Sequence, residues 1–345
     1  LEQEGVDVER GACDLDTAFV ARAGDSGPTV AVICEYDALP EIGHACGHNV
    51  IAAAGLGAGL ALAGMATELG GSVVIIGTPA EEGGGGKVHM IERGAFEGVD
   101  VAMMVHPAGI DLTRMNTLAI HRCRAEYHGA AAHAAAAPQK GRNALDGAIL
   151  GYNAVAALRQ HIAPDERVHG IITHGGDKPN IVPQYAAAEW YVRSPRVETL
   201  RRLRERVTAC LTGGATASGV DVEVEWLDPA YADMVDNRPL LEMYADNAAA
   251  VGRSVLEPGP DTQVVGSTDM GNVSYVVPSI HPMIKVAPSD VAIHTPDFAG
   301  YAGAESGDRG AIDGAKLLAM TAADVWCDRE MVDRARLAHE SVVGS

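Results

Sequence analysis

The sequence predicts an α/β protein with a doubly wound, mainly parallel sheet and a second domain inserted into the first. Three observations support this fold class. A length of 345 residues suits about two domains. Short apolar runs alternate with a helical stretch in the first third of the chain, and the middle third has a different order of strands and helices.

The first domain begins with three continuous apolar runs, at 29–34, 71–77 and 99–105. Runs of this length rich in β-branched residues are typical of strands buried on both faces. Between the first two lies the Ala- and Gly-rich stretch 50–66, which predicts a buried helix capped by Asn49. A membrane span is the weaker interpretation, because the stretch barely reaches the ~20 residues that a bilayer requires.

The middle of the chain predicts a compact unit of its own. A strand to residue 128 is followed by a helix over 143–162, strands near 167–175 and 184–193, a helix over 197–212 and an alternating strand over 220–227. This β-α-β-β-α-β order is that of a ferredoxin-like unit. We therefore expect an inserted domain at 117–232 and a catalytic domain at 1–116 and 233–345, with an N-terminus that is apparently clipped.

The composition restricts the partners. Lys and Arg total 26 against 46 Asp and Glu, a formal charge of -20. Such an excess of acid argues against nucleic acid and against an anionic membrane, both of which favour a basic face. The 6 cysteines are scattered along the chain, which favours free thiols and a cytoplasmic location.

Chemically reactive side chains follow each of the three apolar runs. They are Glu35 and Asp37 after the first, Glu81 and Glu82 after the second, and His106 after the third. Ligands of open α/β sheets bind beyond the carboxyl ends of the strands, so these side chains are expected to meet in one crevice.

Two motifs carry metal-binding chemistry. In "HACGH", Gly47 allows a tight turn that can bring Cys46 and His48 to one ion, although such a pair alone is more commonly a packing feature. In "TPAEEGGGGK", the adjacent acids point in different directions, so one can bind a metal while the other faces a bound water. A phosphate-binding loop is rejected, because its first glycine would fall at Glu81 and its Ser or Thr at Val88.

A further histidine, His294 in "IHTPDF", lies far downstream, and His281 in "SIHPM" competes with it for the same role. We favour His294. Cys, His and Glu side chains converging on strand ends suit a pair of divalent ions, which in such sites lie about 3.5–4 Å apart.

The motifs "EYDALPEIGHACGHN", "GTPAEEGGGGK", "VHP", "HAAAAPQKGRNALD", "NIVPQ" and "HTPDF" occur in one order. In this order the chain resembles the amidohydrolases of the aminoacylase and hippurate-hydrolase group, which are co-catalytic metallopeptidases of clan MH. Through "CEYDALP" and "GSTDMGNVS" it is most similar to the aminobenzoyl-glutamate hydrolase branch. The resemblance implies two divalent ions, zinc or manganese, and a lid domain that forms a homodimer.

The resemblance also assigns roles to individual residues. It implies metal ligation by Cys46, His48, Glu82, His106 and His294, a general base at Glu81, an orienting acid at Asp37, a lid histidine at His133 that reaches the partner's substrate, and contacts to a substrate carboxylate at Asn180 and Arg193. The chain departs from other members of the clan at Glu35, where they have His. His44 is expected to support the ligands from behind.

The leading hypothesis is metal-dependent hydrolysis of the amide bond of a small molecule. The substrate would be an N-acyl amino acid, an aminobenzoyl-glutamate-like compound or a small dipeptide-like compound. A metal-activated water would attack the carbonyl with Glu81 as general base, and His133 would stabilise the oxyanion. Two alternatives remain: a thiol hydrolase with Cys46 as nucleophile, and a non-catalytic relative that binds metal or ligand.

Overall fold

The chain divides into two compact units in the computed structural model, which describes residues 1–259 and 265–344. Unit 1 contains Leu1–Thr117 and the segment from Met234 onward, and unit 2 is Leu118–Asp233. The boundaries expected from the sequence were 116/117 and 232/233.

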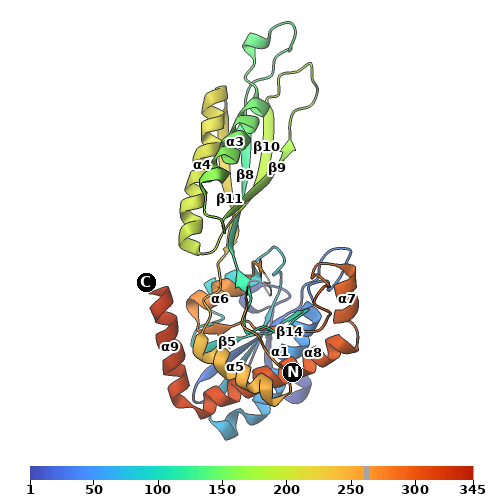
Figure 1. The fold of residues 1–345 in the computed structure, drawn as a ribbon, viewed down its shortest axis with the longest axis vertical. Helices are drawn as coiled ribbons and strands as arrows, with labels where there is room; N and C mark the ends of the chain where they lie inside the picture. The colour runs from blue at the N-terminus through green and yellow to red at the C-terminus, as the bar shows by residue number, and fades with distance from the viewer. Residues whose placement is uncertain (260–264, 345) are drawn as a thin grey trace. The chain divides into compact units, whose positions relative to one another are not determined.

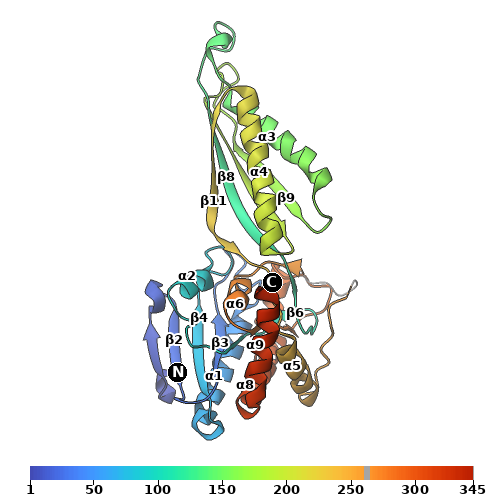
Figure 2. The same cartoon turned by 90° about the vertical axis from the view of Figure 1, so that its left-hand side faces the viewer.

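Unit 1 is built on a six-stranded sheet with the order β1-β2-β4-β3-β5-β13. These strands are β1 (Asp7–Arg10), β2 (Phe19–Ala23), β3 (Thr29–Glu35), β4 (Ser72–Thr78), β5 (Val101–Met103) and β13 (Ser279–Ile280). The pairs β4–β3, β3–β5 and β5–β13 are parallel, whereas β1 and β2 join the edge antiparallel. The predicted mixed α/β fold with a mainly parallel sheet is confirmed. Figure 2 shows β2, β4 and β3 side by side.

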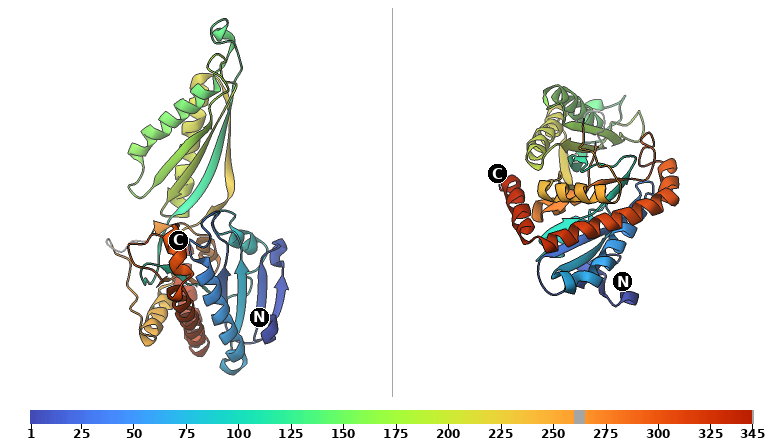
Figure 3. Two further views of the ribbon diagram at one scale, coloured as in Figure 1. Left: turned by 90° about the vertical axis from the view of Figure 1, so that its right-hand side faces the viewer. Right: turned by 60° about the horizontal axis from the view of Figure 1, so that its bottom comes forward.

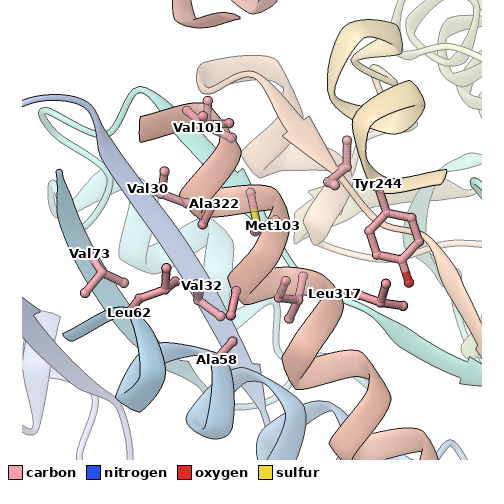
Figure 4. Packing of buried hydrophobic residues seen from close by; sticks show 14 of the residues in the cluster. Val30, Val32, Ala58, Leu62, Val73, Val101, Met103, Tyr244, Leu317 and Ala322 are labelled. Carbon is pink, nitrogen blue, oxygen red and sulfur yellow. The ribbon is translucent and has the colours of Figure 1, made fainter. Parts of the chain in front are cut away.

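Helices cover both faces of this sheet because successive residues of β3 and β4 point to opposite faces and nearly all are apolar. On one face Val30, Val32 and Val73 pack against α1 (His48–Leu69), α5 (Arg238–Ala250) and α8 (Glu305–Cys327), as Figure 4 shows. On the other face Ala31, Ile33 and Ile76 pack against α2 (Gly86–Glu92) and α6 (Met270–Val276). Helices α7 (Pro296–Ala302) and α9 (Arg329–Val343) complete unit 1. Figure 3 shows α8 crossing it.

Helix α1 is the helix that the sequence predicted at 50–66, with three differences. It is longer, its N-cap is Gly47 rather than Asn49, and Asn49 instead donates its amide to the carbonyl of Ala302 at 2.9 Å. Within the described residues α1 alone is long and apolar enough to cross a membrane. Its small residues instead allow close packing on the sheet, since a Cβ at Gly59 would lie 2.5 Å from the side chain of Ile75.

Unit 2 contains a four-stranded antiparallel sheet with the order β11-β8-β10-β9. Its elements along the chain are β8 (Ala119–His128), α3 (Ala144–Leu158), β9 (Arg167–His174), β10 (Tyr185–Ser194), α4 (Val197–Ser218) and β11 (Asp221–Tyr231). Both helices pack on the same face of this sheet, as Figure 1 shows, over a core that includes Tyr127, Trp190 and Leu211. Helix α4 and strand β11 continue beyond their predicted ends at 212 and 227.

Short strands and helical turns fill the remaining connections. The strands are β6 (His106–Ala108) beside β14 (Met283–Lys285), and β7 (Asn116–Thr117) beside β12 (Val265–Gly266). The 3-10 turns are η1 (Glu2–Glu4), η2 (Ala12–Asp14), η3 (Pro138–Lys140) and η4 (Arg159–His161). The β6–β14 pair matters most for function, because His106 opens β6 and His281 lies between β13 and β14.

Candidate metal centre

The reactive side chains of unit 1 meet at the carboxyl edge of its parallel sheet. Glu35 is the last residue of β3 and Asp37 follows it, while Glu81 and Glu82 lie in the loop between β4 and α2. His48 is the first residue of α1. The sheet therefore brings together residues that are far apart in the sequence, as expected for a doubly wound fold.

The turn before α1 directs two ligands to one place. Gly47 has a φ of 82°, in the left-handed region that glycine adopts without steric strain. A Cβ at this position would lie 2.4 Å from Cγ of Pro107, the residue after His106. Gly47 therefore permits both the turn and the close approach of the strand that carries His106.

The five ligands predicted from the sequence fall into two groups that share one atom. Cys46, His48 and His106 form the first group, and Cys46, Glu82 and His294 form the second, with the ligand atoms of each group all within 4.8 Å of one another. The Cys46 Sγ lies 3.5 Å from Nε2 of His106. Oε1 of Glu82 lies 3.5 Å from Nε2 of His294. A shared thiolate between two ligand groups is the arrangement that two neighbouring ions require.

Hydrogen bonds prepare the histidines for this role. Nδ1 of His48 lies 2.9 Å from the carbonyl oxygen of Asp37, and Nδ1 of His106 lies 2.8 Å from that of Pro107. A carbonyl only accepts, so each Nδ1 carries the proton and each Nε2 turns a lone pair into the site. Among the described residues, Nε2 of His48 and Oε1 of Glu82 are buried without a hydrogen-bond partner. Thiolate, imidazole and carboxylate donors with orphaned atoms fit a zinc-type divalent ion.

The electrostatics of the site also favour bound cations. Burial raises the pKa of the Cys46 thiol to about 12. Burial also disfavours charge on His48, but the Glu35 carboxylate and the contact with Asp37 outweigh this effect and raise the pKa of His48 to about 12. Burial and the neighbouring His48 lower the pKa of His106 to about 4. Without a cation, protons therefore occupy Cys46 and His48, and metal binding must displace them.

Glu81 and Asp37 lie beside the ligands. Asp37 has Oδ1 at 3.3 Å from Nδ1 of His48, and its Oδ2 accepts the Glu82 backbone N–H at 3.0 Å, so it contacts two ligand residues at once. The Glu81 carboxylate lies 3.9 Å from Nε2 of His48. Burial, with the charges of Glu35 and Asp269, raises the pKa of Glu81 well above its usual value. A carboxylate with a raised pKa next to a metal pair is suited to accept a proton.

A buried ion cluster below the ligands was not predicted from the sequence. Lys87 pairs with Glu35 and, at 2.7 Å, with Oδ1 of Asp269, and all three side chains are almost fully buried. Asp269 also accepts the Lys87 backbone N–H at 3.0 Å and so holds the start of α2. A lysine in the otherwise apolar segment after the glycines was the available signal, because a buried ammonium needs partners.

The two candidates for the last ligand differ in their surroundings. His294 belongs to a ligand group and has a φ of 64°, an unfavourable value for a non-glycine residue that the 2.7 Å hydrogen bond from its N–H to the Ala45 carbonyl helps to hold. His281 is fully buried with its ring 5.5 Å from that of His106, and it belongs to none of the ligand groups in the described residues. His44 is likewise outside these groups.

The three remaining predicted residues belong to unit 2. Nδ1 of His133 accepts the backbone N–H groups of Ala135 and Ala136 at 3.3 and 3.2 Å, so Nε2 carries the proton and points away from these bonds. The Asn180 carbonyl accepts the N–H of Ala134 at 3.0 Å, which places His133 and Asn180 on neighbouring segments. Arg193 lies on β10, where burial lowers its pKa. Their roles toward a substrate stay predictions.

Comparison with known proteins identifies the family. The sequence pattern of peptidase family M20/M25/M40 matches residues 31–299. The chain belongs to this family. The resemblance inferred from the motifs is thereby confirmed, and with it the class of metal-dependent hydrolases that act on amide bonds.

Individual M20 relatives are similar over most of the chain. The Xaa-Arg dipeptidase of Mus musculus is 42% identical, over 90% of this chain and 75% of that protein. One of the two kinds of p-aminobenzoyl-glutamate hydrolase chain in Escherichia coli is 29% identical, over 99% of this chain and 86% of that protein. A dinuclear metal-binding M20 peptidase from Bacillus subtilis shares the fold, with a TM-score of 0.71 and 20% identity over 94% of this chain and 89% of that one.

Proposed function

We propose that this M20 protein hydrolyses the amide bond of an N-acyl amino acid, an aminobenzoyl-glutamate-like compound or a small dipeptide, with two divalent ions and Glu81 as general base. The observation that carries the proposal is the Cys46 sulfur, which belongs to two ligand groups beside the Glu81 carboxylate. The dipeptidase and aminobenzoyl-glutamate hydrolase relatives support the substrate class. An intracellular, cytoplasmic setting suits its free cysteines.

The ion pair, zinc or manganese, would polarise the scissile carbonyl and lower the pKa of the attacking water. Glu81 takes the proton of that water and passes it to the nitrogen of the leaving amine. Asp37 keeps His48 and the Glu82 backbone in place through its contacts at 3.3 and 3.0 Å. Each of these functions belongs to a side chain at the sheet edge of unit 1.

Unit 2 is proposed to act as a ferredoxin-like lid and dimerisation domain. The sheet order β11-β8-β10-β9 with two helices on one face supports this fold type. The hydrogen bonds at Nδ1 of His133 leave Nε2–H as a donor for the oxyanion that develops on the substrate carbonyl in the partner subunit. Asn180 and Arg193 would hold the substrate carboxylate.

A thiol mechanism has one observation in its favour, the 3.5 Å approach of the Cys46 Sγ to Nε2 of His106. A Cys–His pair of this kind can activate a thiol. Burial, however, raises the pKa of Cys46 to about 12, which opposes a reactive thiolate. The thiol mechanism also gives no function to Glu82 and His294. The third hypothesis, a non-catalytic relative, leaves Glu81 beside the ligands without a role.

A substrate screen with metal-reconstituted protein tests the proposal. N-acyl amino acids, dipeptides that end in basic or neutral residues, and aminobenzoyl-glutamate would be offered to protein loaded with Zn²⁺ or Mn²⁺, and amine release would be measured. We expect turnover of at least one class, with none in Glu81→Gln at equal metal content. Turnover by metal-free protein, together with an acyl adduct on Cys46, would instead establish the thiol mechanism. Metal binding with no turnover of any class would favour the non-catalytic relative.

A further inference from the structure

Glu35 carries a buried negative charge that its neighbours do not balance. Its carboxylate and that of Asp269 share the single ammonium of Lys87, and Glu35, Asp269 and Lys87 are at most 1% exposed. Glu81 adds a third carboxylate within 4.8 Å of the Glu35 oxygen. Two negative charges would remain if all three acids were ionised, and a buried charge requires a counter-charge.

The atom that faces Glu35 is a lone pair and not a hydrogen-bond donor. Nδ1–H of His48 donates to the Asp37 carbonyl at 2.9 Å, so Nε2 of the neutral ring is bare. Oε1 of Glu35 lies 3.1 Å from this Nε2, yet the two atoms form no hydrogen bond, because their orientation is unsuitable. Two acceptors at this distance repel each other unless a cation binds both. With bonds of about 2.0–2.2 Å, two ligands of one ion are separated by a distance of this order.

We infer that Glu35, His48 and Glu81 form an additional, oxygen-rich cation position, separate from the two groups that contain Cys46. The ligand atoms of these three residues lie within 4.8 Å of one another, and His48 is completely buried. One imidazole and two carboxylates suit Mn²⁺ or Mg²⁺, whereas the Cys46 thiolate favours zinc-like ions. Lys87 and Asp269 hold Glu35 in place at this position.

The position has a consequence for catalysis, which rests on the proposed function of Glu81. Nε2 of His48 also belongs to the group with Cys46 and His106, and one lone pair binds one ion. Occupation of the oxygen-rich position and of that Cys46 group therefore excludes each other. A cation bound to Glu81 also removes the base that accepts the water proton. Excess oxygen-preferring ions should inhibit the enzyme, and zinc-like ions should relieve the inhibition.

The test uses Cys46→Ser in the full chain, because this change removes the atom shared by both other groups and leaves all three ligands of the new position. Binding of Mn²⁺ would be measured from the spin-resonance signal of the free ion, and nitrogen coupling of the bound ion would identify an imidazole ligand. We expect about one Mn²⁺ per chain with coupling to one imidazole. Adding Glu35→Gln should weaken this binding by about 10–100-fold.

A matched control is Cys46→Ser with Glu82→Gln, which removes a carboxylate of the other group and should retain Mn²⁺. In Glu35→Gln the Lys87 ammonium still has Asp269 as a partner, and Glu35→Asp gives a second variant that keeps the charge but withdraws the oxygen. The inference is overturned if Cys46→Ser binds no Mn²⁺, or if the Glu35 and Glu82 changes affect binding equally. Turnover is not measured, so these outcomes are independent of the proposed hydrolysis.

Discussion

The two units bury very different kinds of residues. At the sheet edge of unit 1, Glu35, His48, Glu81, Lys87 and Asp269 are all buried, and together they form a charged cluster below the ligands. The buried interior of unit 2 is almost entirely apolar, with Tyr127, Trp190 and Val207 among its members. In the described part of unit 2, the polar side chains that are buried are His121, Ser194 and Asp233.

This difference shows which unit depends on an ion. Each large apolar side chain of unit 2 contributes about 1.5–3 kcal/mol on burial, and this contribution requires no ligand. Unit 1 also has a large apolar core, but the edge of its sheet holds several acids and two unprotected imidazole lone pairs. Ionised groups in such surroundings are stable only when paired. The fold of unit 1 should therefore be coupled to metal, and that of unit 2 should not.

Removal of metal should have the largest effect and should act on unit 1 alone. Chelation is expected to abolish turnover reversibly, and to lower the stability of unit 1 by about 3 kcal/mol under conditions where the ion was present at 100 times its dissociation constant. Hydrogen exchange of peptides from each unit, measured with and without chelator, checks this. Equal changes in the two units, or full activity without metal, would contradict the comparison.

Exchange of the two adjacent acids should separate chemistry from ion binding within unit 1. Glu81→Gln is expected to retain metal and to lower turnover by about 10²–10⁴-fold, because an amide cannot accept the proton of water. Glu82→Gln should chiefly weaken metal retention, since Oε1 of Glu82 faces His294 at 3.5 Å. Metal content by elemental analysis and turnover at saturating metal distinguish the two variants. The reverse pattern would mean that base and ligand are exchanged.

Much of unit 1 could be predicted because its information is local. Each apolar run gave a strand, and the polar residues directly after the runs lie at one edge of the sheet. The five proposed ligands, Glu81 and Asp37 meet there because parallel strands end together. The family motifs located His294, whose position depends on a loop far downstream.

The pairing of Lys87 could not be predicted, because its partners are 52 and 182 residues away in the chain. The sequence around Lys87 was considered only as a phosphate loop, and that interpretation was correctly rejected. The cap of α1 was wrong for a related reason. Asn49 is a good capping residue, but the close approach of Pro107 requires glycine at position 47, and Asn49 bonds to Ala302 instead.

The lid histidine tests whether unit 2 contributes to the chemistry of unit 1. His133→Ala should lower turnover by about 10²–10³-fold, the usual effect of losing one oxyanion donor, while metal content and dimerisation stay unchanged. His133→Gln, which keeps an N–H donor, should retain more activity than His133→Ala.

Mixing two inactive proteins shows whether His133 acts across a dimer. Under subunit exchange, His133→Ala and Glu81→Gln form mixed dimers in which one site has both Glu81 and a partner's His133. Activity should then return toward one working site per mixed dimer. Continued inactivity after exchange has been demonstrated by mass spectrometry would refute the shared site.

The smallest expected effect concerns His121, the histidine that unit 2 buries. Burial and the nearby Arg204 lower the pKa of His121 from 6.5 to about 4, although Asp228 opposes this with an oxygen at 3.4 Å. The unfolded chain therefore binds a proton near pH 6.5 that the folded unit resists until about pH 4. Stability due to the neutral ring is present above pH 6.5 and is lost as the pH falls through this window.

We expect a loss of about 1 kcal/mol in unit 2, less than the pKa shift alone implies, because the exposed Asp228 and solvent screen the charge. His121→Phe should remove this pH dependence, since the ring packs beside Trp226 and a phenyl group occupies a similar volume. His161→Phe is the matched control on an exposed turn, where the pH dependence should persist. Denaturant unfolding of unit 2 between pH 4 and 7, followed by hydrogen exchange, gives the measurement. If unit 2 were equally pH-dependent with and without His121, its buried interior would contain a titrating group that the comparison with unit 1 leaves out.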